Sequence, residues 1–166
     1  MIEVVRARPE HVKGIVSVCS DGYRATYKDL HTQEYIEKVI SDFYNDERVL
    51  NEVENSSKNW GGYFVALDGN QVVGAAGGGM TSDDTGELFV IYLDQTRRNE
   101  GIGSLLLEAV TDQQRAWGAT TQWVSVTKDN QKGIPFYESR GFIFQSEQDN
   151  WLNAKETKTL RYKREI

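Results

Sequence analysis

The apolar residues of this chain follow two different periodicities on either side of a central loop. From residue 102 to residue 117 they recur at intervals of three and four, which gathers them on one face of a helix. Residues 88–93 instead form a short apolar run, rich in aromatic and β-branched side chains and typical of a buried strand. A polar loop, 94–100, joins the two. The pattern predicts a strand, a loop and an amphipathic helix.

The same periodicities predict elements before and after this unit. A first helix opens at Pro9 and Glu10 and ends near Asp21, a second begins after a capping Thr32, and a short third surrounds residues 49–53. The expected strands are residues 2–7, a hairpin of 63–67 and 71–80, and residues 122–126, 142–145 and 157–163. A chain of 166 residues with this organisation is expected to be a single domain over residues 1–166.

One strand of the hairpin contains an unusual segment of glycine and alanine at residues 74–79. Glycine weakens a strand, and it usually marks a bulge or a close approach by other atoms. The segment therefore predicts one of these features, and a loosely held strand end is the alternative.

Composition narrows the range of functions. The net charge of −6 argues against a nucleic-acid or anionic-membrane surface, which needs clustered lysine and arginine. It is compatible with a cationic substrate, although many proteins of no such function are equally acidic. Cys19 is the single cysteine, and His11 and His31 are isolated, so neither a disulfide nor a metal site is expected.

The N-terminus lacks the basic, apolar and small-residue order of a signal peptide, and no window is long and apolar enough to span a bilayer. A cytoplasmic location is therefore expected.

The loop before the central helix suits a phosphate. The first amides of a helix have no acceptor within it and carry partial positive charge, and glycines at 101 and 103 let an anion approach them. Arg97 and Arg98 add charge beside the loop. A P-loop is excluded because Gly103 is not followed by Lys-Ser/Thr, and a dinucleotide fingerprint is excluded because position 106 is leucine.

Two motifs carry a resemblance to a known family. The segment Arg98-Asn99-Glu100-Gly101-Ile102-Gly103 resembles the acyl-CoA loop of the GNAT N-acetyltransferase superfamily, and about 30 residues later the segment 130–142 resembles its second signature, N-x-x-A-x-x-F-Y-x-x-x-G-F. Gly133 stands where the family has a small alanine. Pro135 is a departure, because proline inside a helix removes a hydrogen bond. The helix is therefore expected to begin late, near Gly133, and to end at a left-handed Gly141.

The resemblance implies an α/β (α+β) fold with a mixed, mostly antiparallel sheet of six to seven strands flanked by helices. It also implies acetyl transfer from acetyl-CoA, as co-substrate, to a primary amine of a small molecule or a peptide. Many such proteins form homodimers, and nothing in the sequence decides this. The residues expected to bind the cofactor are Ile91, Tyr92 and Leu93 along its pantetheine arm, Arg98, Asn99, Glu100, Gly101, Ile102, Gly103 and Ser104 around its diphosphate, and Asn130 beside the arm.

Two residues are expected to move protons. An alkyl amine has a pKa of about 10, so at neutral pH it must lose a proton before it can attack. Glu87 precedes Arg98 by eleven residues, a spacing similar to that of the catalytic glutamate in the histone-acetylating branch. Strand alternation places it on one face with Phe89, Ile91 and Leu93. Its alternative role is an ion pair at the strand entrance.

Tyr137 matches the family's general acid, which protonates the leaving thiolate, and its alternative role is a core aromatic. Tyr23, Tyr27, Trp60 and the acidic helices are candidates for the acceptor pocket, which would suit a polyamine or an aminoglycoside. A protein that binds CoA as a sensor without turnover is the competing function.

Overall fold

A seven-stranded sheet forms the centre of the molecule, in the strand order β1-β2-β3-β4-β5-β7-β6. The computed structural model describes residues 1–149 and 158–166. The strands are β1 (Ile2–Arg6), β2 (Tyr63–Asp68), β3 (Gln71–Met80), β4 (Thr85–Leu93), β5 (Thr121–Thr127), β6 (Ile143–Asp149) and β7 (Lys158–Glu165). The one parallel pair among them is β4 with β5, and the other pairs of these described strands are antiparallel. The expected mixed, mostly antiparallel sheet is confirmed.

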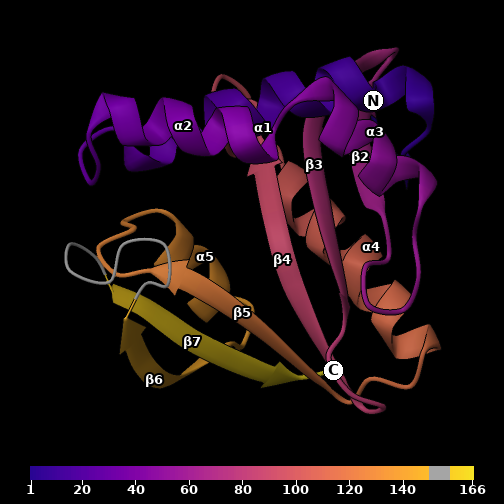
Figure 1. The fold of residues 1–166 in the computed structure, drawn as a ribbon. Coiled ribbons are helices and arrows are strands. Elements are labelled where there is room, and N and C mark those ends of the chain that lie inside the picture. Colours follow the sequence, from indigo (N-terminus) through magenta and orange to yellow (C-terminus); the bar gives the residue numbers. More distant parts are fainter. Residues whose placement is uncertain (150–157) are drawn as a thin grey trace.

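Helices cover both faces of this sheet (Figure 1). On one face lies α4 (Ile102–Ala116), whose Ile102, Leu106 and Val110 pack with the strands in the larger apolar core. On the other face α1 (Val12–Tyr27) packs through Ile15 and Cys19. The remaining helices are α2 (Gln33–Phe43) and α3 (Asp46–Glu54), which lie beside α1, and the short α5 (Gly133–Glu138).

Local sequence signals account for most of these boundaries. Thr32 accepts a hydrogen bond from the Tyr35 amide and caps α2 as expected. Helix α5 begins at Gly133, so Pro135 falls in its first turn, and Gly141 has a φ of 91°. The strand predicted at residues 142–145 runs from Ile143 to Asp149. The last strand is described from Lys158, and the first residue predicted for it, 157, lies outside the described part of the chain.

The predicted end of the first helix is wrong. Helix α1 continues through Asp21 and Gly22 to Tyr27. A Cβ placed on Gly22 would lie 2.6 Å from the Tyr92 ring, so this glycine lets the helix pack closely on β4. Glycine here serves close packing rather than helix termination.

The glycine-rich segment of β3 contains a bulge. Gly77 pairs with Val90 and Gly78 with Leu88, which leaves Phe89 as the extra residue on β4. A Cβ on Gly78 would lie 2.2 Å from the Glu87 carbonyl oxygen. The predicted bulge is thus confirmed, and the segment is closely packed.

The bulge also overturns the face assigned to Glu87. Leu88 lies in the core on the α4 side, and Ile91 and Leu93 pack against that same core. The extra Phe89 shifts the alternation by one residue. Glu87 therefore lies on the opposite side of the sheet from Ile91 and Leu93.

A buried polar network holds the base of the β4–β5 pair. The Gln114 side-chain amide donates to the Glu87 carbonyl oxygen (2.9 Å) and to that of Gly79 (3.3 Å). Gln122 on β5 donates to the Gln114 side-chain oxygen (3.0 Å). Both glutamines are fully buried, so their hydrogen bonds tie α4 to the strands beside the bulge.

Beyond this base the two strands separate (Figure 1). Among the described residues, β4 pairs with β5 only over Thr85–Leu88 and Thr121–Val124. Residues 89–93 of β4 and 125–127 of β5 continue without pairing to each other. The divergence opens a cleft in the middle of the sheet.

Candidate active site

The cleft between the diverging strands has a volume of about 890 Å³, within the usual range for a ligand pocket. It is lined by the separated parts of β4 and β5, the C-terminal end of α1, the loop after β5, and α5. Of the residues expected to bind the cofactor, it brings together Ile91, Tyr92, Leu93, Arg98, Gly103 and Asn130. Residues far apart in the sequence thus meet at one site.

One part of the cleft is the N-terminal end of α4. Asn99 and Gly101 adopt positive φ values of 66° and 80°, which turn the chain sharply into the helix. The amides of Ile102, Gly103 and Ser104 form the first turn, where no acceptor exists within the helix. A Cβ on Gly103 would lie 2.9 Å from the Phe136 ring, so the glycine also allows α5 to pack here.

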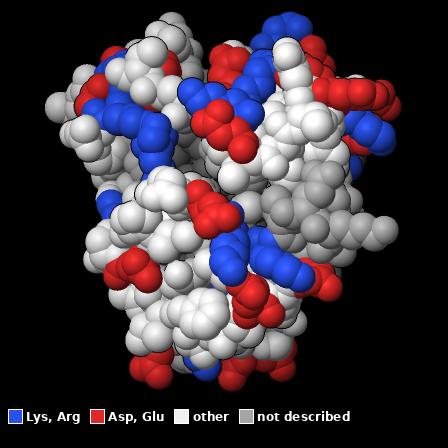
Figure 2. Space-filling view, turned by 90° about the vertical axis from the view of Figure 1, so that its left-hand side faces the viewer, with Lys and Arg blue, Asp and Glu red and all other residues white. Residues whose placement is uncertain are grey.

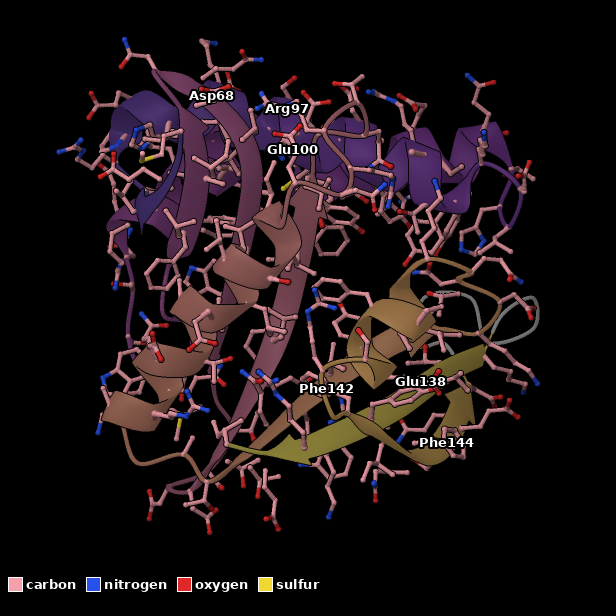
Figure 3. The ribbon with its side chains drawn as sticks, turned by 180° about the vertical axis from the view of Figure 1, so that it is seen from behind. Asp68, Arg97, Glu100, Glu138, Phe142 and Phe144 are labelled. Carbon is pink, nitrogen blue, oxygen red and sulfur yellow. The ribbon has the colours of Figure 1, made fainter. Side chains whose placement is uncertain are left out.

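The two adjacent arginines have different roles. Arg97 donates to Asp68 (2.9 Å) and with two nitrogens to Glu100 (2.8 and 2.9 Å), and Figure 3 shows these three side chains together at the start of α4. Its charge is therefore used within the protein, contrary to the expectation that it adds to a phosphate site. Arg98 is exposed, lines the cleft and donates to the Gln95 side-chain oxygen (2.6 Å).

Ser104 and Asn130 make contacts within the protein. The Ser104 hydroxyl accepts a hydrogen bond from Arg140, whose guanidinium stacks on the Phe136 ring at 3.7 Å. The Asn130 side-chain oxygen accepts from the Gly133 amide (2.9 Å). These contacts fix α5 against the first turn of α4, which preorganises this part of the cleft.

The edge of β4 supplies main-chain groups. Past Leu88 the strand pairs with β3 on one side, and its other side faces the cleft. Such an edge can pair with an extended, amide-bearing ligand as an added strand would.

Tyr137 lies inside the cleft wall. Its ring is buried and packs edge-on against Phe136 (5.2 Å between centroids) and Phe142 (5.6 Å), and the residue lines the cleft. Burial raises the pKa of Tyr137 above its ordinary value, and nearby Tyr27 raises it further. The phenol is therefore neutral at physiological pH and can donate a hydrogen bond.

Glu87 forms the ion pair that was the alternative to a catalytic role. Its two carboxylate oxygens accept from Arg161 at 2.8 and 3.0 Å, and both side chains are mostly buried. Arg161 also donates to Ser125 (2.7 Å) and lies over the Trp123 ring. Glu87 is next to Leu88, which lines the cleft, but is not itself among the lining residues.

The residues predicted to form the acceptor pocket line the cleft only in part. Tyr27 lines the cleft, whereas Tyr23 and Trp60 are not among its lining residues. Trp60 instead packs within 2.4 Å of the position a Cβ on Gly77 would take, and donates to the Glu52 carbonyl oxygen (2.9 Å). Carboxylates do line the cleft, but they belong to Asp29 and Asp129 rather than to the acidic helices.

The outer surface has mixed charge. On the face drawn in Figure 2, acidic and basic side chains are interspersed around a hollow in the upper half of the molecule. Across residues 1–149 and 158–166, none of the helices combines the length and apolar character that a bilayer crossing requires.

Comparison with known proteins identifies the family. The model of the acetyltransferase (GNAT) family matches residues 23–142, most of the chain and both loop motifs. The chain belongs to this family. It is an N-acetyltransferase, and the resemblance of its two motifs to that family is confirmed.

Individual relatives differ in their acceptors. The chain is 26% identical over 142 residues to spermidine N(1)-acetyltransferase of Thermoplasma acidophilum, covering 85% of this chain and 88% of that protein. It is 37% identical over 59 residues, 36% of the chain and 40% of the relative, to [ribosomal protein bS18]-alanine N-acetyltransferase of Escherichia coli. Among solved structures, the PaiA N-acetyltransferase of Thermoplasma acidophilum in complex with coenzyme A superposes with a TM-score of 0.87 at 21% identity, covering 100% and 99% of the two chains.

Arg98→Ala is expected to weaken acetyl-CoA binding about 10- to 100-fold, because a charge-assisted hydrogen bond to phosphate contributes about 1.5–3 kcal/mol. Isothermal titration calorimetry at fixed salt measures this effect. Arg115→Ala, which removes an exposed arginine in the last turn of the same helix, is the control and should leave the affinity within about twofold. Wild-type affinity for acetyl-CoA in the Arg98 variant would contradict the expectation that Arg98 binds a phosphate of the cofactor.

Proposed function

We propose that this protein transfers the acetyl group of acetyl-CoA to a primary amine of a small cationic molecule. The observation that carries the proposal is one cleft that is lined by both the first turn of α4 and Tyr137, with an edge of β4 along it that β5 leaves unpaired. A diphosphate, an extended amide-bearing arm and a thioester need these three features in one place.

The residues present fit acetyl-CoA as the co-substrate. The first-turn amides of α4 and the Arg98 guanidinium would hold its diphosphate, because they combine free donors with positive charge. Residues 91–93 of β4 would pair with the pantetheine amides. The main-chain amides near the bulge would polarise the carbonyl under attack.

Tyr137 supplies the proton that the leaving sulfur needs. As the new C–N bond forms and the C–S bond breaks, the negative charge moves to sulfur, and the phenol donates its proton there. The attacking nitrogen, positively charged once the C–N bond has formed, loses its second proton, and a proton returned through water restores the phenol. The raised pKa of Tyr137 keeps the phenol protonated at neutral pH, and its packing against two aromatic rings fixes its direction.

The amine must lose a proton before it attacks. Both oxygens of Glu87 already accept hydrogen bonds from Arg161, and Glu87 is not among the residues that line the cleft. We therefore assign Glu87 a structural role at the base of the cleft. The proton then leaves to water in the cleft, and the rate depends on the fraction of neutral amine.

Two observations favour a polyamine over other amines. Asp29 and Asp129 line the cleft beside Lys28 and Lys132, and the two carboxylates can pair with further ammonium groups of the acceptor. The relative named as a spermidine acetyltransferase matches most of this chain, whereas the ribosomal-protein acetyltransferase matches a short segment.

Thiol release from acetyl-CoA over a panel of polyamines, aminoglycosides and N-terminal peptides tests the function. We expect turnover, with the highest kcat/KM for a polyamine. Calorimetry with acetyl-CoA runs alongside it. Binding of acetyl-CoA without thiol release on any amine would favour the competing sensor function, and failure to bind would contradict both.

Tyr137→Phe is expected to lower kcat about 100-fold while the Kd for acetyl-CoA changes less than about threefold, because general-acid catalysis of this kind contributes roughly 10²–10⁴-fold. Below a pH of about 10, the ordinary tyrosine value, the wild-type rate should show no loss from phenol ionisation. Tyr162→Phe, at a buried tyrosine of the same core outside the cleft lining, is the control. Unchanged turnover in the Tyr137 variant would remove the acid role.

Glu87→Gln is expected to lower the free energy of unfolding by about 1–3 kcal/mol, because it leaves Arg161 mostly buried beside a neutral partner. We expect kcat/KM to fall less than tenfold and still to rise about tenfold per pH unit below the amine pKa. Urea unfolding and pH–rate profiles measure these effects. Glu37→Gln, which removes an exposed partner of Arg24, is the control. A fall of 100-fold or more in a variant that stays folded would establish Glu87 as the base.

A further inference from the structure

Tyr27 joins the two separated arms of the cleft. Its hydroxyl lies 3.0 Å from the Thr127 hydroxyl, within hydrogen-bond distance, and Tyr27 and Tyr92 pack against the same small apolar cluster. Tyr92 belongs to β4 and Thr127 to β5, and both lie past the last residues that pair these strands. Tyr27 of α1 therefore bonds to β5 and packs beside β4 where the hydrogen bonding between the two strands has ended.

This contact lies at the open end of the cleft. Figure 1 shows α1 and α2 lying across the tip of β4, with the tip of β5 well apart from it. Tyr27, Tyr92, Thr127 and Tyr137 all line the same cleft. At this end the cleft between the strands is therefore lined by Tyr27 as well as by β4 and β5. The phosphate-binding end of α4 lies on one side of the sheet and the α1 layer on the other.

The bridge is held rigidly by its surroundings. The ring centroids of Tyr23 and Tyr27 are 4.4 Å apart, and the His31 ring stacks on the Tyr27 ring with 5.3 Å between centroids. Burial raises the pKa of Tyr27. The phenol therefore stays protonated across the physiological pH range and can donate to the Thr127 hydroxyl.

We propose that the Tyr27–Thr127 bridge determines acceptor specificity by limiting the width of the cleft, so that unbranched primary amines enter and amines branched beside the nitrogen are excluded. This inference rests on the proposed acetyl transfer. A hydroxyl-to-hydroxyl bridge fixes the separation of α1 and β5, and a packed aromatic layer cannot widen without breaking it. A straight alkylamine presents only hydrogen atoms beside its nitrogen, whereas a peptide N-terminus carries a side chain and a carbonyl there.

The test compares two amines in four proteins. Tyr27→Phe and Thr127→Val each remove one hydroxyl and keep the side-chain shape, and the double variant removes both. For each protein we measure kcat/KM with an unbranched diamine and with a matched amine that carries a methyl group on the carbon bonded to nitrogen. Tyr23→Phe is the control, since Tyr23 packs on Tyr27 but is not among the residues lining the cleft. Calorimetry with acetyl-CoA shows whether the donor side is intact.

We expect the preference for the unbranched amine to fall at least tenfold in both single variants, with acetyl-CoA affinity within about threefold of wild type. The double variant should be no worse than the singles, because both substitutions break the same bridge. An unchanged preference in both single variants of an active enzyme would overturn this inference alone. A wild-type protein that turns over no amine would overturn the proposed function and this inference with it.

Discussion

The early end of hydrogen bonding between β4 and β5 is the constraint on which the site depends. Parallel strands normally continue to pair along their length, but here the pairing stops at Leu88 and Val124. The extra residue at Phe89 changes the course of β4 at that point, and the closely packed glycines of β3 accommodate it. Gln114 and Gln122 hold the paired base together from the α4 side. A ligand can enter the middle of the sheet because the first halves of β4 and β5 stay paired while their second halves separate.

Charged groups around the cleft divide into those that build it and those that face it. Arg97 is held by Asp68 and Glu100, and Arg161 is held by Glu87, so both pairs stabilise the walls. Arg98 faces the cleft. The division matters for chemistry, because a charge already paired within the protein contributes little to the binding of a ligand.

The tyrosines on the α1 side of the sheet also differ in role: most of them pack within one layer, and one reaches β5. Tyr23, Tyr44 and Tyr92 pack into the layer between the helices and β4, and burial raises the pKa of each of them. Tyr27 belongs to the same layer, but its hydroxyl reaches β5. The layer is therefore both a packing element and the boundary of the cleft on its α1 side.

The sequence by itself determined the order of elements, the glycine loop at the start of α4, the late start of α5 and the family. These features depend on neighbours within a few residues: apolar periodicity, a capping threonine, and glycines that relieve strain. The face of Glu87, the partner of Arg97, the continuation of α1 past Gly22 and the bridge from Tyr27 to Thr127 were decided only by the tertiary structure. Each depends on an atom that is distant in sequence: the bulge opposite Gly78, Asp68 on β2, the Tyr92 ring and the tip of β5. The glycines of β3 predict a bulge, but which residue of β4 it displaces, and the other three contacts, leave no local pattern, because strand separation and helix packing bring the partners together only when the whole sheet has formed.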